Sequence, residues 1–214
     1  MARVVIFGGT GYAGGHIACE AASRGHQVIS YARNAPEEPL DGVEYRTGSL
    51  ASPEVLTAAA ADADVLIVAV HGADVDGAPL ATHMPQLVEA ARSGGARLAF
   101  VGGAGSSLVA EDGPRLVDTP DFVDDWKPEA LAHAEVLEAL QQTPEDLDWF
   151  YVSPAALFGV FAPGEATGSY RTDGDVLVAK DDGSSEISGA DFALAFVDEI
   201  ENHAHPRQRF TVGH

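Results

Sequence analysis

The chain has 214 residues, of which 46% are hydrophobic and 21% are charged, and none of its apolar runs approaches the roughly 18 residues that span a bilayer. Its formal net charge of −21 repels the phosphates of nucleic acids and anionic membrane surfaces, so neither is an expected partner. With one cysteine, Cys19, it forms no internal disulfide, and without a signal-peptide pattern at its N-terminus we expect a cytoplasmic protein.

Strand-like and helix-like segments alternate along almost the whole chain. The predicted elements are, in order, a strand at 3–8, a helix at 12–23, strands at 27–32 and 43–47, a helix from 53, a strand at 64–70, a helix ending at 94–95, a strand at 97–103, a helix from 128, a strand at 147–154, a strand candidate at 175–180, a helix at 189–202 and a strand at 209–213. Cys19 stands among Ala and Ile of the first helix, so we expect it to be buried.

Apolar strands that alternate with helices indicate a parallel sheet covered on both faces. We therefore predict a doubly wound, Rossmann-like α/β fold, with residues 1–214 in one domain and 155–214 as its smaller, substrate-side part. Two stretches without clear periodicity, 104–127 and 155–175, each follow a predicted strand. Ligands of such folds bind at the carboxyl ends of the strands, so these stretches are candidates for a binding site.

The opening stretch VVIFGGTGYAGGHI, residues 4–17, runs from a strand through glycines into a helix. Gly8, Gly11 and Gly14 fit G-x-x-G-x-x-G, while Gly9, Gly11 and Gly14 fit G-x-G-x-x-G. Such glycines allow a tight turn, close approach of a pyrophosphate to the backbone, and close packing of the helix. The pattern predicts dinucleotide binding at the start of the helix, and a plain strand–turn–helix junction is the alternative.

The end of the second predicted strand bears on which dinucleotide binds. NAD-binding proteins carry an acid there, about twenty residues past the glycines, for the ribose 2′-hydroxyl. This chain reads VISYARN, with Arg33 nineteen residues after Gly14. A guanidinium suits a 2′-phosphate, so NADP(H) is favoured over NAD(H), unless Arg33 is simply a solvated cation.

At this point the sequence resembles a known family. GGTGYAGG, YARN, VGGAGS and PEALAHAEVLEAL…DWFYVSPAALF are together similar to the atypical short-chain dehydrogenase/reductases, and most of all to the NAD(P)H-binding, NmrA-like group that contains the NADH-flavin reductases. The similarity continues through ISGADFALAFVDEIE and RQRFTVG, close to the end of the chain. It implies the fold and the cofactor, whereas the group spans reductases, quinone reductases and redox-sensing proteins without turnover.

The resemblance also implies site residues by motif position. It implies Gly8, Thr10, Gly11, Tyr12 and Ala13 at the pyrophosphate, Arg33 at the 2′-phosphate, Ser49 and Leu50 at adenine, Ala69, Val70 and His71 at the nicotinamide-side ribose, and Gly102, Gly103 and Pro154 at the nicotinamide. Many relatives carry Asp at the position of Ser49, so the adenine hydrogen bond of those relatives is not implied here.

The catalytic pair of classical short-chain dehydrogenases, Tyr-x-x-x-Lys, is missing. The only lysines are Lys127 and Lys180, and the residues four positions earlier are Val123 and Val176. Carbonyl reduction by the usual mechanism, in which the tyrosine protonates the product, therefore loses support.

Two other residues stand near the expected place of a catalytic group. Ser106, after the fifth strand, resembles the catalytic serine position, and a loop hydroxyl that bonds backbone is the alternative. His133 shares a helix face with Val136, Leu137 and Leu140, so we expect it to face inward. A core histidine with satisfied hydrogen bonds and a proton donor both fit that position. His203 and His205 show no ligand pattern for a metal, and we expect none.

Hydride transfer to a flavin or quinone suits a site without a strong acid, because the charge is delocalised and solvent supplies the proton. Aromatic residues that could line an acceptor pocket are Phe122, Trp126, Phe158, Phe161 and Tyr170. We therefore predict an NADP(H)-dependent oxidoreductase that acts on a small planar acceptor, as a monomer or homodimer. The alternatives are a non-catalytic NADPH sensor of the NmrA-like type and a ketone reductase that uses Ser106 and His133.

Overall fold

The computed structural model describes residues 1–214 and contains one eight-stranded sheet with the order β3-β2-β1-β4-β5-β6-β8-β7. All neighbouring strands are parallel except β7, which runs antiparallel to β8. The strands are β1 (Arg3–Phe7), β2 (Gln27–Ala32), β3 (Val43–Thr47), β4 (Val65–Val68), β5 (Arg97–Val101), β6 (Trp149–Ser153), β7 (Arg171–Asp173) and β8 (Gln208–Gly213).

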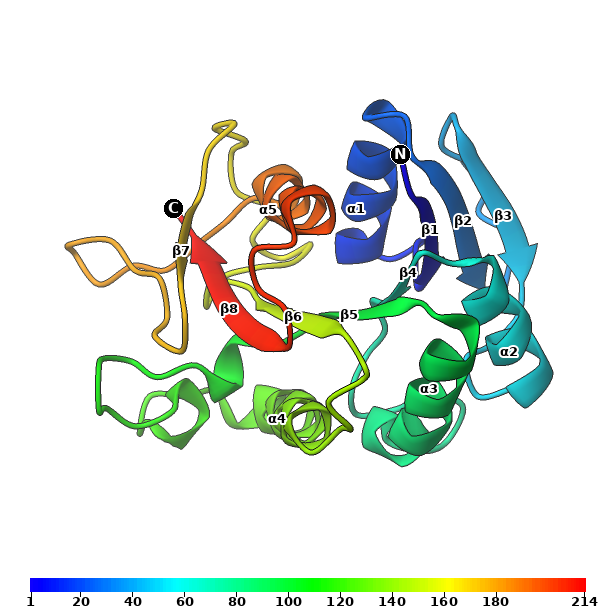
Figure 1. Ribbon diagram of the computed structural model, residues 1–214. Coiled ribbons are helices and arrows are strands. Elements are labelled where there is room, and N and C mark those ends of the chain that lie inside the picture. The colour runs from blue at the N-terminus through cyan, green and yellow to red at the C-terminus, as the bar shows by residue number, and fades with distance from the viewer.

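Helices cover both faces of this sheet (Figure 1). They are α1 (Tyr12–Ser23), α2 (Pro53–Asp62), α3 (Leu80–Gly94), α4 (Lys127–Gln141) and α5 (Gly189–Asn202). Helices α1 and α5 lie on one face, and α2, α3 and α4 lie on the other. The predicted doubly wound, Rossmann-like α/β fold is therefore confirmed.

Two apolar cores form because successive strand residues point to opposite faces. In β1, Val4 and Ile6 pack beneath α1 and α5, whereas Val5 and Phe7 pack against α2 and α3. The same alternation runs through β4, β5 and β6. These strands are buried on both sides, which explains their unbroken apolar sequences.

The ends of the helices follow local sequence signals. Ser52 caps α2 by accepting a hydrogen bond from the backbone N–H of Val55, and Pro53 occupies its first turn. Ser188 caps α5 in the same way through the N–H of Asp191. Helix α3 ends at Gly94, and the capping residue Gly95 has a φ of +70°, which glycine readily adopts.

Two expectations are wrong. Residues 175–180 form no strand, because the free edge of β8 pairs with Arg171–Asp173 instead and Val176 makes only an isolated bridge to Leu108. Cys19 is exposed, because it lies on the outer side of α1, whereas Ile17, Ala18 and Ala21 face the sheet.

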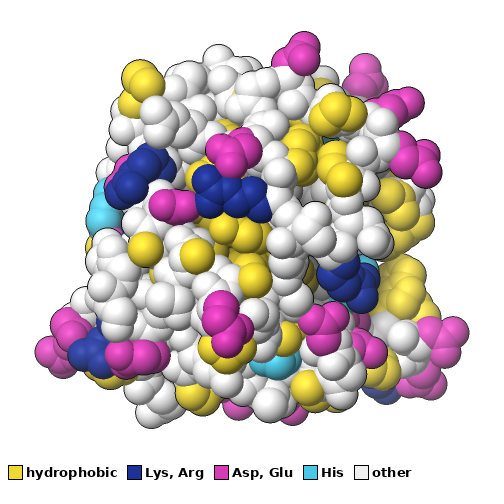
Figure 2. All heavy atoms as spheres, turned by 90° about the vertical axis from the view of Figure 1, so that its right-hand side faces the viewer, with side chains coloured by type: hydrophobic (Ala, Val, Ile, Leu, Met, Phe, Trp, Pro, Cys, Tyr) yellow, Lys and Arg dark blue, Asp and Glu magenta, His cyan; other side chains and the backbone are white.

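The face over β3 and α2 shows how the acidic surface is arranged (Figure 2). Basic side chains lie against acidic ones, and further acidic groups stand alone around the rim. Arg46 is one of the paired cations, with Nε 2.6 Å from Glu44 and Nη1 2.6 Å from Asp62. No helix combines the length and apolarity needed to cross a membrane.

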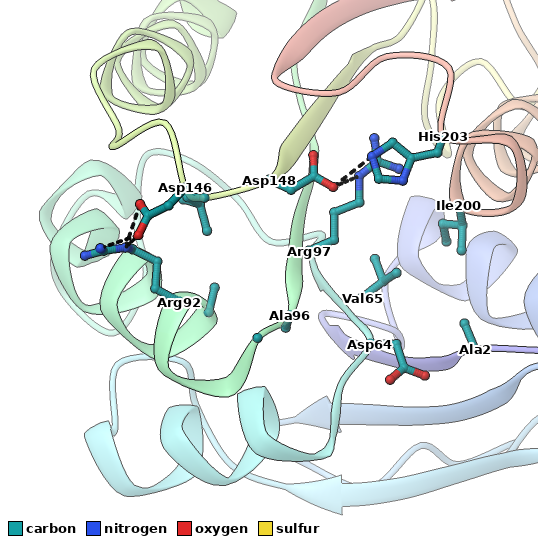
Figure 3. Close-up of a pocket in the computed structure, with 13 residues that line it drawn as sticks. Ala2, Asp64, Val65, Arg92, Ala96, Arg97, Asp146, Asp148, Ile200 and His203 are labelled. Atoms are coloured by element: carbon teal, nitrogen blue, oxygen red, sulfur yellow. Dashed lines mark hydrogen bonds and ion pairs between the residues drawn. The ribbon is translucent and has the colours of Figure 1, made fainter.

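At the amino-terminal edge of the sheet, a cavity of about 370 Å³ opens beside a buried ion-pair cluster (Figure 3). The Arg97 guanidinium lies 2.6 Å from the Glu199 carboxylate and 3.1 Å from that of Asp148, and it stacks 4.4 Å from the centre of the Phe150 ring. Only 7% of the Arg97 side chain and 2% of the Glu199 side chain are exposed. This cluster joins the start of β5 to the end of α5.

We expect Arg97→Ala to lower the free energy of unfolding by about 3–5 kcal/mol, because it leaves the Glu199 carboxylate buried without its cation. Arg92→Ala is the matched control: its pair with Asp146 is more exposed and should contribute less than about 1 kcal/mol. Denaturant unfolding followed by circular dichroism measures both. Equal losses in the two variants would contradict a stabilising role for the buried cluster.

Candidate functional site

The turn between β1 and α1 is held by close backbone contacts. Gly8 has a φ of +90°, and a Cβ there would lie 2.2 Å from the carbonyl oxygen of Ala69, after β4. A Cβ on Gly9 would lie 2.4 Å from Ser30 Oγ, and one on Gly14 would lie 2.3 Å from the oxygen of Gly8. The packing of the protein itself therefore requires these three glycines.

Gly11 differs from them, because the crowding at this position is much milder. A Cβ would meet only the oxygen of Gly8, at 3.3 Å, a tight contact that a small shift relieves, and the φ of −82° suits any residue. Gly11 precedes the first turn of α1 and is exposed. A glycine that the fold does not need fits a position where a ligand approaches the backbone.

The N-terminus of α1 has no cap, unlike those of α2 and α5. No side chain bonds its free N–H groups, and its first turn contains no acidic residue. The backbone N–H groups of Tyr12, Ala13 and Gly14 have no acceptor within the protein. Partial positive charge and free donors at one helix end form a site for an anion such as a pyrophosphate.

The side chain of Tyr12 points away from this anion site. Its hydroxyl donates to the backbone oxygen of Pro163, at 3.2 Å, and accepts from the N–H of Gly189, at 3.0 Å. Tyr12 thus ties the start of α1 to the loop after β6 and to the start of α5. Only its backbone is available for the predicted pyrophosphate contact.

The predicted adenosine end lies at the carboxyl ends of β2 and β3. The Arg33 side chain is 80% exposed and makes no hydrogen bond, and its Nη1 lies 4.0 Å from Asp76. The hydroxyl of Ser49 donates to the other oxygen of the same carboxylate. Leu50 is 2% exposed and packs in the core, so its side chain offers little contact surface to a ligand. Asp76, which the sequence analysis missed, therefore joins Arg33 and Ser49.

The predicted nicotinamide end brings together the carboxyl ends of β4, β5 and β6. Gly102 lies against Tyr151, whose ring would be 2.0 Å from a Cβ at that position. The Tyr151 hydroxyl accepts from the N–H of Gly103, at 3.2 Å, and donates to the backbone oxygen of His133, at 3.1 Å. Burial raises the pKa of Tyr151, which keeps its hydroxyl protonated, and its hydrogen is committed to the backbone of His133, so the structure assigns this tyrosine a packing role.

Glu129 is a second residue that the sequence analysis missed. Its carboxylate accepts hydrogen bonds from the backbone N–H groups of Gly72, at 2.8 Å, and Ala73, at 2.9 Å. It also lies 3.1 Å from His133 Nε2 and 3.3 Å from His71 Nδ1. Its position four residues before His133 on one helix face was the available signal.

Burial alone would raise the pKa of Glu129, but the hydrogen bond from His133 and those from the two backbone N–H groups lower it to about 2. The carboxylate is therefore ionised and can only accept hydrogen bonds, so His133 donates to it from a protonated Nε2. Glu129 thus orients the His133 ring and fixes the start of the loop after β4.

His133 and Ser106 are brought to the same region. His133 is 7% exposed, as its helix face predicted, and Nδ1 is buried without a partner. Ser106 lies in a short 3-10 helix, Ala104–Ser106, that packs on α4, and its Oγ is also buried without a partner. His133 is therefore neither a core histidine with all its hydrogen bonds satisfied nor an accessible proton donor. Its Nδ1 and the Oγ of Ser106 can each still form a hydrogen bond beside the predicted nicotinamide end.

Four of the five aromatic residues predicted to line an acceptor pocket divide into two groups, and the fifth, Phe122, is partly buried and joins neither. Phe158 packs on Phe192, with ring centres 4.5 Å apart, and Tyr170 donates to Asp198, so both serve the fold. Trp126 and Phe161 pair with ring centres 5.4 Å apart, yet 44% and 62% of these residues are exposed. Only the second pair offers an apolar surface to a ligand.

We expect Glu129→Gln to lower the free energy of unfolding at pH 7 by about 1–2 kcal/mol, a modest value because solvent reaches 37% of the side chain and screens the charge. The folded-state pKa lies below the ordinary 4.5, so the stabilisation is complete above that pH and is lost as the pH falls toward about 2. The difference in free energy of unfolding between wild type and variant should therefore disappear as the pH falls from 4.5 toward about 2.

Glu135→Gln is the control for this measurement, because Glu135 is an exposed residue of the same helix without an ion-pair partner. Unfolding curves at a series of pH values give both differences. A gap that stays constant down to pH 2 would contradict the assigned role of the Glu129 carboxylate.

Comparison with known proteins agrees with this geometry. The model of the NAD(P)H-binding family matches residues 8–203. YwnB of Bacillus subtilis (strain 168) is 36% identical over 219 aligned residues, which cover 98% of this chain and 97% of YwnB.

Two solved structures are similar over their whole length. A Burkholderia pseudomallei protein named "putative exported protein" has 39% identity and a TM-score of 0.87, with 100% of both chains covered. SP1627 from Streptococcus pneumoniae TIGR4, named "a putative NADH-flavin reductase", has 31% identity and a TM-score of 0.81, with 100% and 99% covered. Given the name of the first, the cytoplasmic location of this chain stays a prediction. With its uncapped helix, its glycine turn and these matches, the chain belongs to the NAD(P)H-binding family.

Proposed function

We propose that the protein binds NADPH and transfers hydride from it to a small planar acceptor, such as a flavin or a quinone. The observation that carries this proposal is the uncapped start of α1 beside Gly11, where free N–H groups meet a glycine that the fold does not require. The free N–H groups can donate several hydrogen bonds to the pyrophosphate of a dinucleotide, and the positive end of the helix dipole attracts its negative charge.

The choice of NADPH over NADH rests on Arg33. Its guanidinium is exposed and makes no hydrogen bond, so it can form paired hydrogen bonds with a 2′-phosphate. No acidic residue replaces it at the end of β2, where a ribose 2′-hydroxyl would need an acceptor. NAD(H) is the less favoured cofactor in this proposal.

A bound dinucleotide would supply hydride from C4 of its nicotinamide ring to the acceptor, which also takes one proton from water. The residues of the chain bind and orient the two molecules. The ends of β4, β5 and β6 hold the nicotinamide end, and the exposed Trp126–Phe161 pair gives an apolar, planar surface for the acceptor.

Ser106 and His133 orient the acceptor or relay a proton in this proposal. Each has one buried polar atom without a partner, and neither belongs to a Tyr-x-x-x-Lys pair. A flavin or quinone needs no strong protein acid, because negative charge spreads over its ring and solvent completes the protonation. The absent lysine therefore agrees with this class of acceptor.

Replacement of Gly11 tests the anion site without disturbing the fold. We expect Gly11→Ala to change the free energy of unfolding by less than about 1 kcal/mol, since its φ is ordinary and the nearest contact is 3.3 Å. Affinity for both NADPH and NADH should fall at least about tenfold, because the new methyl group lies where the pyrophosphate approaches the backbone.

Gly14→Ala is the matched comparison, and we expect it to destabilise the fold because its Cβ would lie 2.3 Å from a backbone oxygen. Thermal unfolding and titration calorimetry measure the two effects. Unchanged cofactor affinity in a folded Gly11→Ala variant would remove the pyrophosphate from this turn.

The acceptor can be identified by following NADPH absorbance with a panel of flavins, quinones and small ketones. We expect consumption with a flavin or quinone that His133→Ala lowers but does not abolish, because solvent can supply the proton. Consumption of ketones that His133→Ala abolishes would instead identify a ketone reductase. Tight NADPH binding without turnover of any acceptor would identify a sensor.

A further inference from the structure

The loop between β4 and α3, residues 69–79, brings an acidic side chain to the predicted adenosine end of the site. In the sheet, β1 separates β4 from β2, so the loop crosses the carboxyl end of β1 to reach Arg33. There Asp76 has one carboxylate oxygen 4.0 Å from Arg33 Nη1, and its other oxygen accepts the hydrogen of Ser49.

A tight turn presents this carboxylate in a defined position. Asp76 and Gly77 have φ values of +52° and +90°. Val75 and Ala78 exchange backbone hydrogen bonds of 2.7 and 3.2 Å around them. The side chain of Asp74 accepts the N–H of Gly77, at 2.8 Å. Aspartate tolerates the left-handed conformation better than most residues, so the turn can keep a carboxylate at its tip.

The rest of the loop is anchored on both sides of the turn. Val75 is 8% exposed and packs in the core beneath α3, and His83 Nε2 lies 3.3 Å from its backbone oxygen. Glu129 binds the N–H groups of Gly72 and Ala73 at the start of the loop. The backbone of Asp76 is therefore held in a fixed position by the contacts on both sides of the turn.

We propose that Asp76 sets how strongly the site prefers a phosphorylated adenosine, because its carboxylate faces Arg33, occupies the hydroxyl hydrogen of Ser49 and repels a 2′-phosphate that binds there. Arg33 has no other ion-pair partner, and the single hydroxyl hydrogen of Ser49 is donated to Asp76. A dianionic phosphate must take the Ser49 hydrogen from the carboxylate, compete with it for the charge of Arg33 and accept a like charge nearby. This inference rests on the proposed binding of NADPH.

The substitution Asp76→Asn removes the charge and keeps the size and the tolerance of a left-handed backbone. The probes are 2′,5′-ADP and 5′-AMP, which differ only in the 2′-phosphate, together with NADPH and NADH. We expect calorimetry to show at least about fivefold tighter binding of 2′,5′-ADP and NADPH, and less than about twofold change for 5′-AMP and NADH. The gain should shrink at high ionic strength, because salt screens an exposed charge.

Asp112→Asn is the control, because Asp112 is also an exposed aspartate with a positive φ, of +60°, and it lies in the separate loop between β5 and α4. It should leave all four affinities unchanged. Equal gains in both variants would show a general effect of net charge and overturn the inference. Weaker binding of 5′-AMP and NADH to Asp76→Asn would also overturn it, because the carboxylate would then be an acceptor for a ribose hydroxyl.

Arg33→Ala separates this inference from the proposed function. It should weaken NADPH and 2′,5′-ADP about 10–100-fold more than NADH and 5′-AMP, since a charge-assisted pair is lost. If it does so and Asp76→Asn changes nothing, only the role of Asp76 fails. If Arg33→Ala affects both cofactors equally, or wild type binds neither, the proposed NADPH site fails together with it.

Discussion

The contact between the β1–α1 turn and the end of β4 is the constraint on which the site depends. Gly8 brings the turn so close to the Ala69 carbonyl that no side chain fits between them, and Gly14 brings α1 equally close to Gly8. This packing leaves the first amides of α1 without partners inside the protein. These free donors and the positive end of the helix dipole are what an anion would bind.

The two ends of the proposed site are organised by one loop. Residues 69–79 start at the predicted nicotinamide end, where Glu129 holds their backbone, and reach the predicted adenosine end, where Asp76 meets Arg33. The hydrogen bonds of Glu129 at one end and the charges of Asp76 and Arg33 at the other are therefore connected by one loop, which the fold holds in place. That arrangement explains why a chain with a net charge of −21 can still offer a site to an anion: the positive contributions are local amides and one guanidinium.

The sequence predicted most of the fold, because its signals are local. Helix α1, strand β2 and helix α5 agree with the expected bounds, since periodicity and caps such as Ser188 depend on nearby residues. The segment 175–180 was predicted incorrectly because pairing at the edge of a sheet depends on tertiary contacts, and Arg171–Asp173 is the segment that lies against β8. Asp76 was missed because it acts on Arg33 and Ser49, which are far away in the chain. Glu129 offered a local signal in His133, four residues on, but its bonds to the backbone of Gly72 and Ala73 form only when the loop folds against α4.

The buried Arg97–Glu199 cluster lies at the amino-terminal ends of the central strands, and the glycine turn lies at their carboxyl ends. The amino-terminal end thus carries an ion pair that joins the final helix to the central strands, and the carboxyl end carries the proposed contacts for ligands. Substitutions in the loops at the carboxyl end do not touch that ion pair. Descendants of a common ancestor can therefore diversify their chemistry while they inherit the same scaffold, which accords with the varied activities found on this architecture.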